Sequence, residues 1–109
     1  MKGGITIRSS YKDSIVQADT SRCYICGRCG VKLDRHEPFG GGLRQKSKRL
    51  GMWVAICHEP CHMQIVHGGS GDGLVAKGLR RDAETAARAA YGWTKEQFIS
   101  EFGKSYTEE

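Results

Sequence analysis

The fold is decided by the stretch Cys57-His58-Glu59-Pro60-Cys61-His62, which continues the apolar run Met52–Cys57. The run has the length of a strand and carries β-forming residues at its centre. Pro60 is tolerated in the first turn of a helix, so a short helix is predicted from about Glu59 to His67. The two cysteines therefore lie where a predicted strand turns into a predicted helix.

A second cysteine pair lies upstream in Cys23-Tyr24-Ile25-Cys26-Gly27, which has the form of a zinc knuckle. The tight turn allows both thiolates to face one ion, and backbone N–H groups near the glycine can support the sulfurs. Cys26-Gly27-Arg28-Cys29 is also a CxxC, so Cys26 and Cys29 are an alternative pair. We favour the first pair because its glycine fits the knuckle, which leaves Cys29 as a fifth, non-ligand thiol.

Together the two pairs predict a structural Zn²⁺ in a closed site of four thiolates. The alternative is that some of these cysteines are ordinary buried core residues. Zinc would help this chain to fold, because 109 residues with 15 glycines and only 39% hydrophobic residues offer a small core. The predicted zinc ligands are Cys23, Cys26, Cys57 and Cys61.

The positive charge of the chain is concentrated in one segment. The formal net charge is +5, and the stretch from Arg28 to Arg49 holds seven basic and two acidic residues, a difference of +5. Its glycine-rich part, residues 40–51, is predicted to be a basic loop that contacts backbone phosphates of a nucleic acid. The alternative is a solubilising loop. The predicted nucleic-acid-binding residues are Arg44, Lys46, Lys48 and Arg49.

The rest of the chain predicts one further strand and two helices. Val31–His36 is predicted to be a short strand, and Leu74–Tyr91 a long helix that ends at Gly92. A last helix follows the capping box Thr94-Lys95-Glu96-Gln97 and ends at Gly103. The predicted fold class is therefore α+β.

These elements are predicted to form a single domain over residues 1–109. Its parts are an N-terminal arm (1–20), a zinc-stapled core (21–67), a glycine-rich linker (68–73) and a helical tail (74–106). In the arm, Ile5 and Ile7 alternate with polar residues, as in a short strand. The sequence has no run of roughly 18 apolar residues and no apolar signal segment at its start. We therefore expect a cytoplasmic protein that does not contact the membrane.

The histidines lie in or just after the segment that the cysteines bracket. His36-Glu37 ends the first predicted strand, and His62 follows Cys61. The order CxxC, His36-Glu37, Phe39–Ser47, an apolar strand and CxxxCH resembles the HNH endonucleases, above all the small HNH proteins of phages and prophages. Leu79–Arg81 and Gln97–Tyr106 are similar to the C-terminal helices of that subfamily, so the resemblance covers about residues 14 to 106.

The resemblance implies a ββα-metal (HNH) core and a metal-dependent DNA endonuclease that hydrolyses phosphodiester bonds. In the family, a strand histidine activates water and a divalent ion stabilises the scissile phosphate. By position, His36-Glu37 matches the first motif and His62 matches the helix ligand of the catalytic ion. Many relatives have two adjacent histidines in the first motif. His36 is therefore either the base or a ligand, and Glu37 takes the other role. The implied catalytic ion is Mg²⁺, Mn²⁺, Ni²⁺ or Zn²⁺.

The sequence departs from the family pattern in one respect, because it contains no asparagine. Leu43 occupies the position at which the subfamily often has one. The group that orients the base is then expected to be His58, His67 or a backbone carbonyl.

Two other functions fit the same sequence. One is a zinc-stabilised DNA-binding module that no longer cuts, and the other is an adaptor whose C-terminal helices dock on a partner. For the nuclease, the expected partners are DNA and, in a phage, packaging or recombination proteins, all in the cytoplasm of the host cell.

Overall fold

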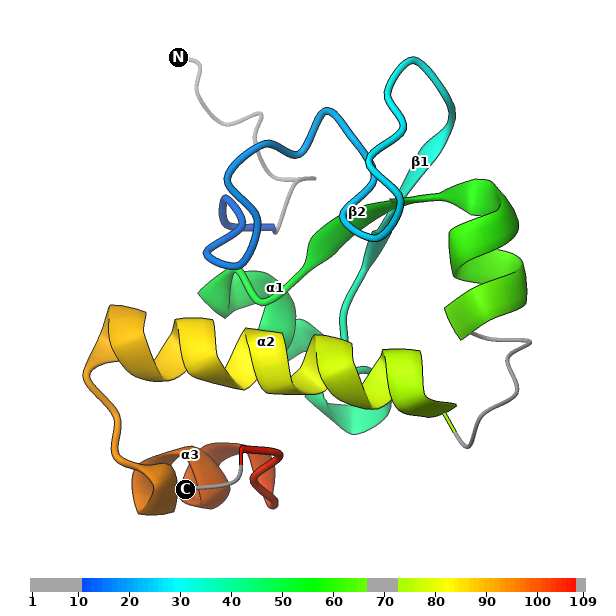
Figure 1. Cartoon of the computed structure of the whole chain (residues 1–109). Coiled ribbons are helices and arrows are strands. Elements are labelled where there is room, and N and C mark those ends of the chain that lie inside the picture. The colour runs from blue at the N-terminus through cyan, green and yellow to red at the C-terminus, as the bar shows by residue number, and fades with distance from the viewer. Residues whose placement is uncertain (1–10, 67–72, 108–109) are drawn as a thin grey trace, which may run out of the picture.

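The structure is a computed structural model that describes residues 11–66 and 73–107. Two antiparallel strands form its only sheet within these ranges, and helices follow them in the chain. Figure 1 shows α2 lying between the strand pair and α3. The elements are β1 (Leu33–His36), η2 (Gly41–Leu43), α1 (Arg44–Leu50), β2 (Val54–Cys57), η3 (His58–Val66), α2 (Leu74–Tyr91) and α3 (Lys95–Phe102). The predicted α+β class is confirmed.

The strand pair presents one face of β1 to η3. Leu33 lies opposite Cys57 and His36 opposite Val54, and all four residues of β2 are buried. Because side chains alternate along a strand, Asp34 and His36 share one face of β1. Asp34 contacts His58 and His62 of η3, which identifies that face as the one turned toward η3.

Helix α2 connects two apolar clusters. The first cluster joins β2 to Cys23 and Cys61 and receives Leu79 from α2. The second cluster receives Ala83 and Ala87 from the next turns of α2 and packs them against aromatic residues of α3 and the segment before η2. Because Leu79, Ala83 and Ala87 are spaced four residues apart, one face of α2 contacts both clusters along its length. None of the helices in the described ranges has the length and apolar character needed to cross a membrane.

The bounds of the last two helices follow the predicted ones closely, because local signals set them. Helix α2 ends at Gly92, whose φ of 68° is left-handed. The capping box before α3 is present: Thr94 Oγ1 accepts a hydrogen bond from Gln97 N (3.0 Å), and Gln97 Oε1 accepts one from Thr94 N (2.8 Å).

The predicted loop at residues 40–51 is wrong, because most of this segment is helical in η2 and α1. Its glycines favoured a loop, yet Arg44–Leu50 contains mainly good helix formers. A buried hydrogen bond anchors the helix, since Ser47 Oγ donates to the carbonyl of Phe39 (2.8 Å). The helix is too short and too charged to show an apolar periodicity in the sequence.

The other predicted elements shift by one or two residues. The two strands begin at Leu33 and Val54, and the helical segment η3 begins at His58. Residues 11–20 of the predicted arm have no regular secondary structure. Ile5, Ile7, His67 and residues 68–72 lie outside the described residues.

Replacing Gly51 by alanine should destabilise the fold more than the same change at Gly92. Both glycines end a helix with positive φ, 78° and 68°. An added Cβ at Gly51 would lie 2.4 Å from the carbonyl oxygen of Asp13, whereas at Gly92 it meets nothing within 4 Å. We expect Gly92→Ala to lower the free energy of unfolding by about 1 kcal/mol and Gly51→Ala by about 3 kcal/mol. Urea unfolding measures the free energy lost in each variant. Equal losses would show that an added Cβ at Gly51 does not clash with the carbonyl oxygen of Asp13.

Candidate metal centre

Four cysteines from three parts of the chain converge at the start of η3. Their Sγ atoms all lie within 4.8 Å of one another. The Sγ atoms of Cys26 and Cys57 are 3.8 Å apart. Ligands about 2.3 Å from a tetrahedral zinc ion lie about 3.8 Å from one another, so this spacing fits zinc. The cluster consists of Cys23, Cys26, Cys57 and Cys61 and can hold a structural zinc ion, as predicted.

The turn that carries the first two thiols is closed by backbone hydrogen bonds. Gly27 N donates to Cys23 O (2.9 Å), and Cys23 N donates to Arg28 O (2.8 Å). Gly27 has a φ of 82°, which favours glycine. Burial acts to raise the pKa of the Cys23 thiol, but backbone N–H groups at Cys26, Cys57 and Ile25 outweigh it and lower that pKa. The turn is therefore built to support a thiolate.

A buried glutamine attaches this turn to the sheet. Gln17 Nε2 donates to the carbonyls of Asp19 (2.9 Å) and Arg22 (2.8 Å), and Gln17 Oε1 accepts from Ala55 N (2.7 Å). The first cysteine pair is thereby fixed against β2, which carries Cys57.

Cys29 does not belong to the group of converging thiols. It is exposed, and its backbone pairs with Arg22 in an isolated antiparallel bridge. The bridge closes the turn after Cys26, which agrees with the choice of Cys23 and Cys26 as the first pair.

A second group of potential metal ligands lies where one face of β1 is turned toward η3. Asp34 Oδ2 is 2.7 Å from His58 Nδ1 and 2.8 Å from His62 Nδ1. The ligand atoms of these three residues all lie within 4.8 Å of one another. One carboxylate and two imidazoles suit Mn²⁺, Fe²⁺, Ni²⁺ or Zn²⁺ and leave coordination positions open. We call these three residues the His/Asp group.

Asp34 is the residue that joins the two histidines of this group. Burial acts to raise the pKa of its carboxyl, but hydrogen bonds with His62 and His58 prevail and hold the pKa below its usual range. The carboxylate is therefore ionised at neutral pH, which is the form that binds a cation.

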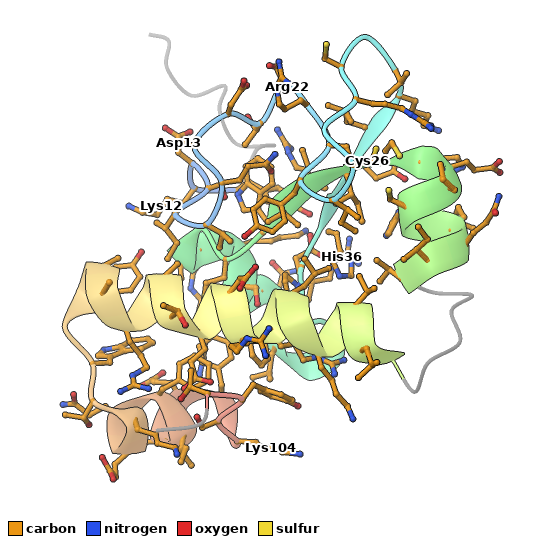
Figure 2. The ribbon with its side chains drawn as sticks, viewed as in Figure 1. Lys12, Asp13, Arg22, Cys26, His36 and Lys104 are labelled. Carbon is orange, nitrogen blue, oxygen red and sulfur yellow. The ribbon has the colours of Figure 1, made fainter. Side chains whose placement is uncertain are left out.

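His36 lies next to the His/Asp group at the end of β1. Its ring meets the His62 ring edge to face, with centroids 5.3 Å apart. Figure 2 shows His36 at the end of β1, near η3 and α2. His36 lines a cavity of about 350 Å³ together with residues of η3, of α2 and of the segment that follows β1, which are Val66, Ala76, Arg80, Glu37, Pro38, Gly40 and Gly41. We call this the His36 cavity.

Glu37, the second residue of the predicted catalytic pair, has its carboxylate oxygens engaged elsewhere. Tyr11 Oη donates to Glu37 Oε2, and Arg44 Nε lies 3.4 Å from Glu37 Oε1. Its side chain is only 10% exposed. Burial, and then the neighbouring Glu37 carboxylate, raise the pKa of Tyr11. The contacts hold the start of α1 against the end of β1.

The four predicted nucleic-acid-binding residues lie along α1, and they differ in how far they are tied into the fold. Lys46 Nζ donates to the carbonyl of Glu101 (2.8 Å) and pairs with its carboxylate (3.1 Å). Lys48 Nζ lies 5.0 Å from the centre of the Tyr11 ring. Arg44 pairs with Glu37, and Arg49 is exposed. Of the four, Arg49 is the least constrained.

Sequence reasoning missed Asp34 and gave His58 only an orienting role. Two signals were present. Asp34 and His36 are spaced two residues apart, which places them on one strand face, and His58 and His62 are four apart, as on one face of a helix. In the structure this second spacing is only partly helical, because Glu59 has the extended backbone angles φ −137° and ψ 137° inside η3.

Comparisons with known proteins do not identify the two metal-ligand groups, which are therefore assigned from their geometry. The chain matches no protein-family model, no curated protein and no solved structure. An antiparallel strand pair followed by a helical segment, with four cysteines and the His/Asp group at their junction, is consistent with a ββα-metal-like core.

Proposed function

We propose that this protein is a metal-dependent endonuclease that hydrolyses phosphodiester bonds of DNA. The observation that carries the proposal is the His/Asp group beside His36 at the edge of a cavity. In the proposal, the four cysteines hold a structural Zn²⁺, and Asp34, His58 and His62 hold a second divalent ion. When bound, that ion supplies Lewis-acid stabilisation of the phosphate and of the leaving oxygen.

His36 is the proposed general base. An imidazole has a pKa near neutral pH, so its neutral form can accept the proton of an attacking water. Glu37 is the weaker candidate because Tyr11 and Arg44 already occupy its oxygens. We therefore assign Glu37 a positioning role at the junction of β1 and α1.

The choice of DNA as substrate is supported by charge. The whole net charge of +5 falls between residues 28 and 49, and α1 carries four of these cations close in sequence to the proposed site. Lysine and arginine that neutralise phosphates release condensed counterions, which favours binding to a polyanion without sequence preference.

Cleavage of supercoiled plasmid by the purified, zinc-loaded protein tests the proposal. Mg²⁺, Mn²⁺, Ni²⁺ and Zn²⁺ are titrated in turn, with wild type beside His36→Ala. We expect cleavage in at least one ion and a loss of about 10²-fold or more in the variant, because general-base catalysis contributes that much. Zinc content and circular dichroism serve as controls for folding.

One result would count against the nuclease, and another would count against His36 as its base. Salt-sensitive DNA binding without cleavage in any ion would select the zinc-stabilised DNA-binding module. Equal activity of wild type and His36→Ala would show that His36 is not the base.

A further inference from the structure

The cavity beside His36 has a cationic wall that the charge distribution of the sequence does not indicate. Arg80 of α2 lines the His36 cavity and also a neighbouring cavity of about 220 Å³ near Leu43, Phe102 and Tyr106. Pro38 and Gly40 line both cavities as well. The two cavities therefore meet around Arg80. None of the four α1 cations lines either of them.

The guanidinium of Arg80 is held in place through its Nε and through an aromatic ring. Its Nε donates to the carbonyl oxygen of Pro38 (3.1 Å), and its central carbon lies 5.6 Å from the centre of the Tyr106 ring. Among the residues that the structure describes, its two terminal nitrogens donate no hydrogen bond and form no ion pair. A fixed guanidinium with unused donors is preorganised to bind an oxyanion.

The acidic residue of the His36 cavity does not neutralise Arg80. Of the described residues that line the cavity, only Glu37 is acidic, and Arg44 and Tyr11 already engage its carboxylate. Within residues 11–66 and 73–107, no carboxylate therefore pairs with Arg80 next to His36. Within the proposed function, the anion that must lie next to the general base is a phosphate of the DNA strand.

We infer that Arg80 binds a backbone phosphate of the DNA strand in the His36 cavity, so that α2 forms one wall of the reaction site. The inference rests on the proposed function in taking DNA as the ligand. It makes the helical tail a part of the site rather than an appendage to the metal-binding core. It also separates two cationic regions: Arg80 faces the reacting strand, while α1 lies outside the cavity.

The salt dependence of DNA binding tests this inference without requiring cleavage. Wild type, Arg80→Gln and Arg81→Gln are titrated into a labelled duplex at several salt concentrations, without added divalent cation. Arg81 is the matched control, because it is the next residue of α2, carries the same charge and is exposed. The slope of log K against log salt is negative for a protein that binds phosphates. We expect Arg80→Gln to make it less steep by about 0.9, the value for one phosphate contact. Arg81→Gln should change it much less. Equal slopes for the two variants would overturn the inference.

A third variant separates phosphate binding from support of the fold. Arg80→Lys keeps the charge, so it should restore most of the salt slope that Arg80→Gln loses. If the salt slope of Arg80→Lys is as shallow as that of Arg80→Gln, Arg80 only supports the segment at Pro38. The inference is then wrong. Thermal melting of each variant confirms that the compared proteins are folded.

The cleavage assay distinguishes failure of this inference from failure of the proposed function. If wild type cuts DNA, we expect Arg80→Gln to lower kcat/KM at least tenfold, as for loss of a hydrogen bond to a charged group, and Arg81→Gln to change it little. Cutting by wild type with equal activity of both variants would overturn the role of Arg80 and leave the nuclease intact. Binding without cutting would overturn the nuclease, and the salt slopes would still decide whether Arg80 contacts phosphate.

Discussion

Replacing Cys61 by serine is expected to unfold the protein or to reduce its zinc content to near zero. Cys61 is 1% exposed and lies in the first apolar cluster, where its thiol is one of four that converge. Burial and the neighbouring thiols raise its pKa, so without a cation the four groups do not all ionise. Binding of a structural zinc ion contributes about 10–16 kcal/mol at neutral pH, which equals or exceeds the whole stability of a typical domain.

Metal analysis and circular dichroism of the purified variants measure this effect. Cys29→Ser is the matched control, because Cys29 is exposed and outside the converging group. It should retain the zinc content and the spectrum of wild type. A folded, zinc-loaded Cys61→Ser protein, or loss of zinc in Cys29→Ser, would show that the ligand set is misassigned.

The second large effect is expected at Asp34. Its carboxylate lies within 2.8 Å of both imidazoles of the His/Asp group and is the only anionic member of that group. Asp34→Asn should therefore weaken binding of the catalytic ion strongly and abolish cleavage at ordinary metal concentrations. Raising the Mn²⁺ concentration should restore part of the activity, since His58 and His62 remain.

The metal dependence separates the roles of three residues. In His36→Ala, additional metal should restore nothing, because the missing group is the proton acceptor and not a ligand. Glu37→Gln should keep the metal dependence of wild type, because its oxygens contact Tyr11 and Arg44 instead of the His/Asp group. Cleavage is measured against Mn²⁺ concentration for each variant. Rescue of His36→Ala by metal, with no rescue of Asp34→Asn, would reverse the assignment of base and ligand.

The sequence determined those features that depend on residues close together in the chain. The bounds of α2 and α3 were predictable because Gly92, Gly103 and the capping box at Thr94 act within one helical turn. The thiol pairs were predictable because the knuckle at Cys23 and the strand end at Cys57 are each local structures.

Only the tertiary structure decided which side chains join His36 and His62 in the candidate reaction site. Asp34 gains its role because the register of β1 on β2 turns its face toward η3, and Glu37 is drawn to Tyr11 and Arg44 by the packing of α1. Arg80 reaches the His36 cavity because the apolar face of α2, with Leu79, Ala83 and Ala87, packs against both clusters and fixes the helix beside β1. These contacts join residues far apart in the chain. They depend on how buried surfaces fit together in three dimensions, and no local pattern of residues encodes that fit.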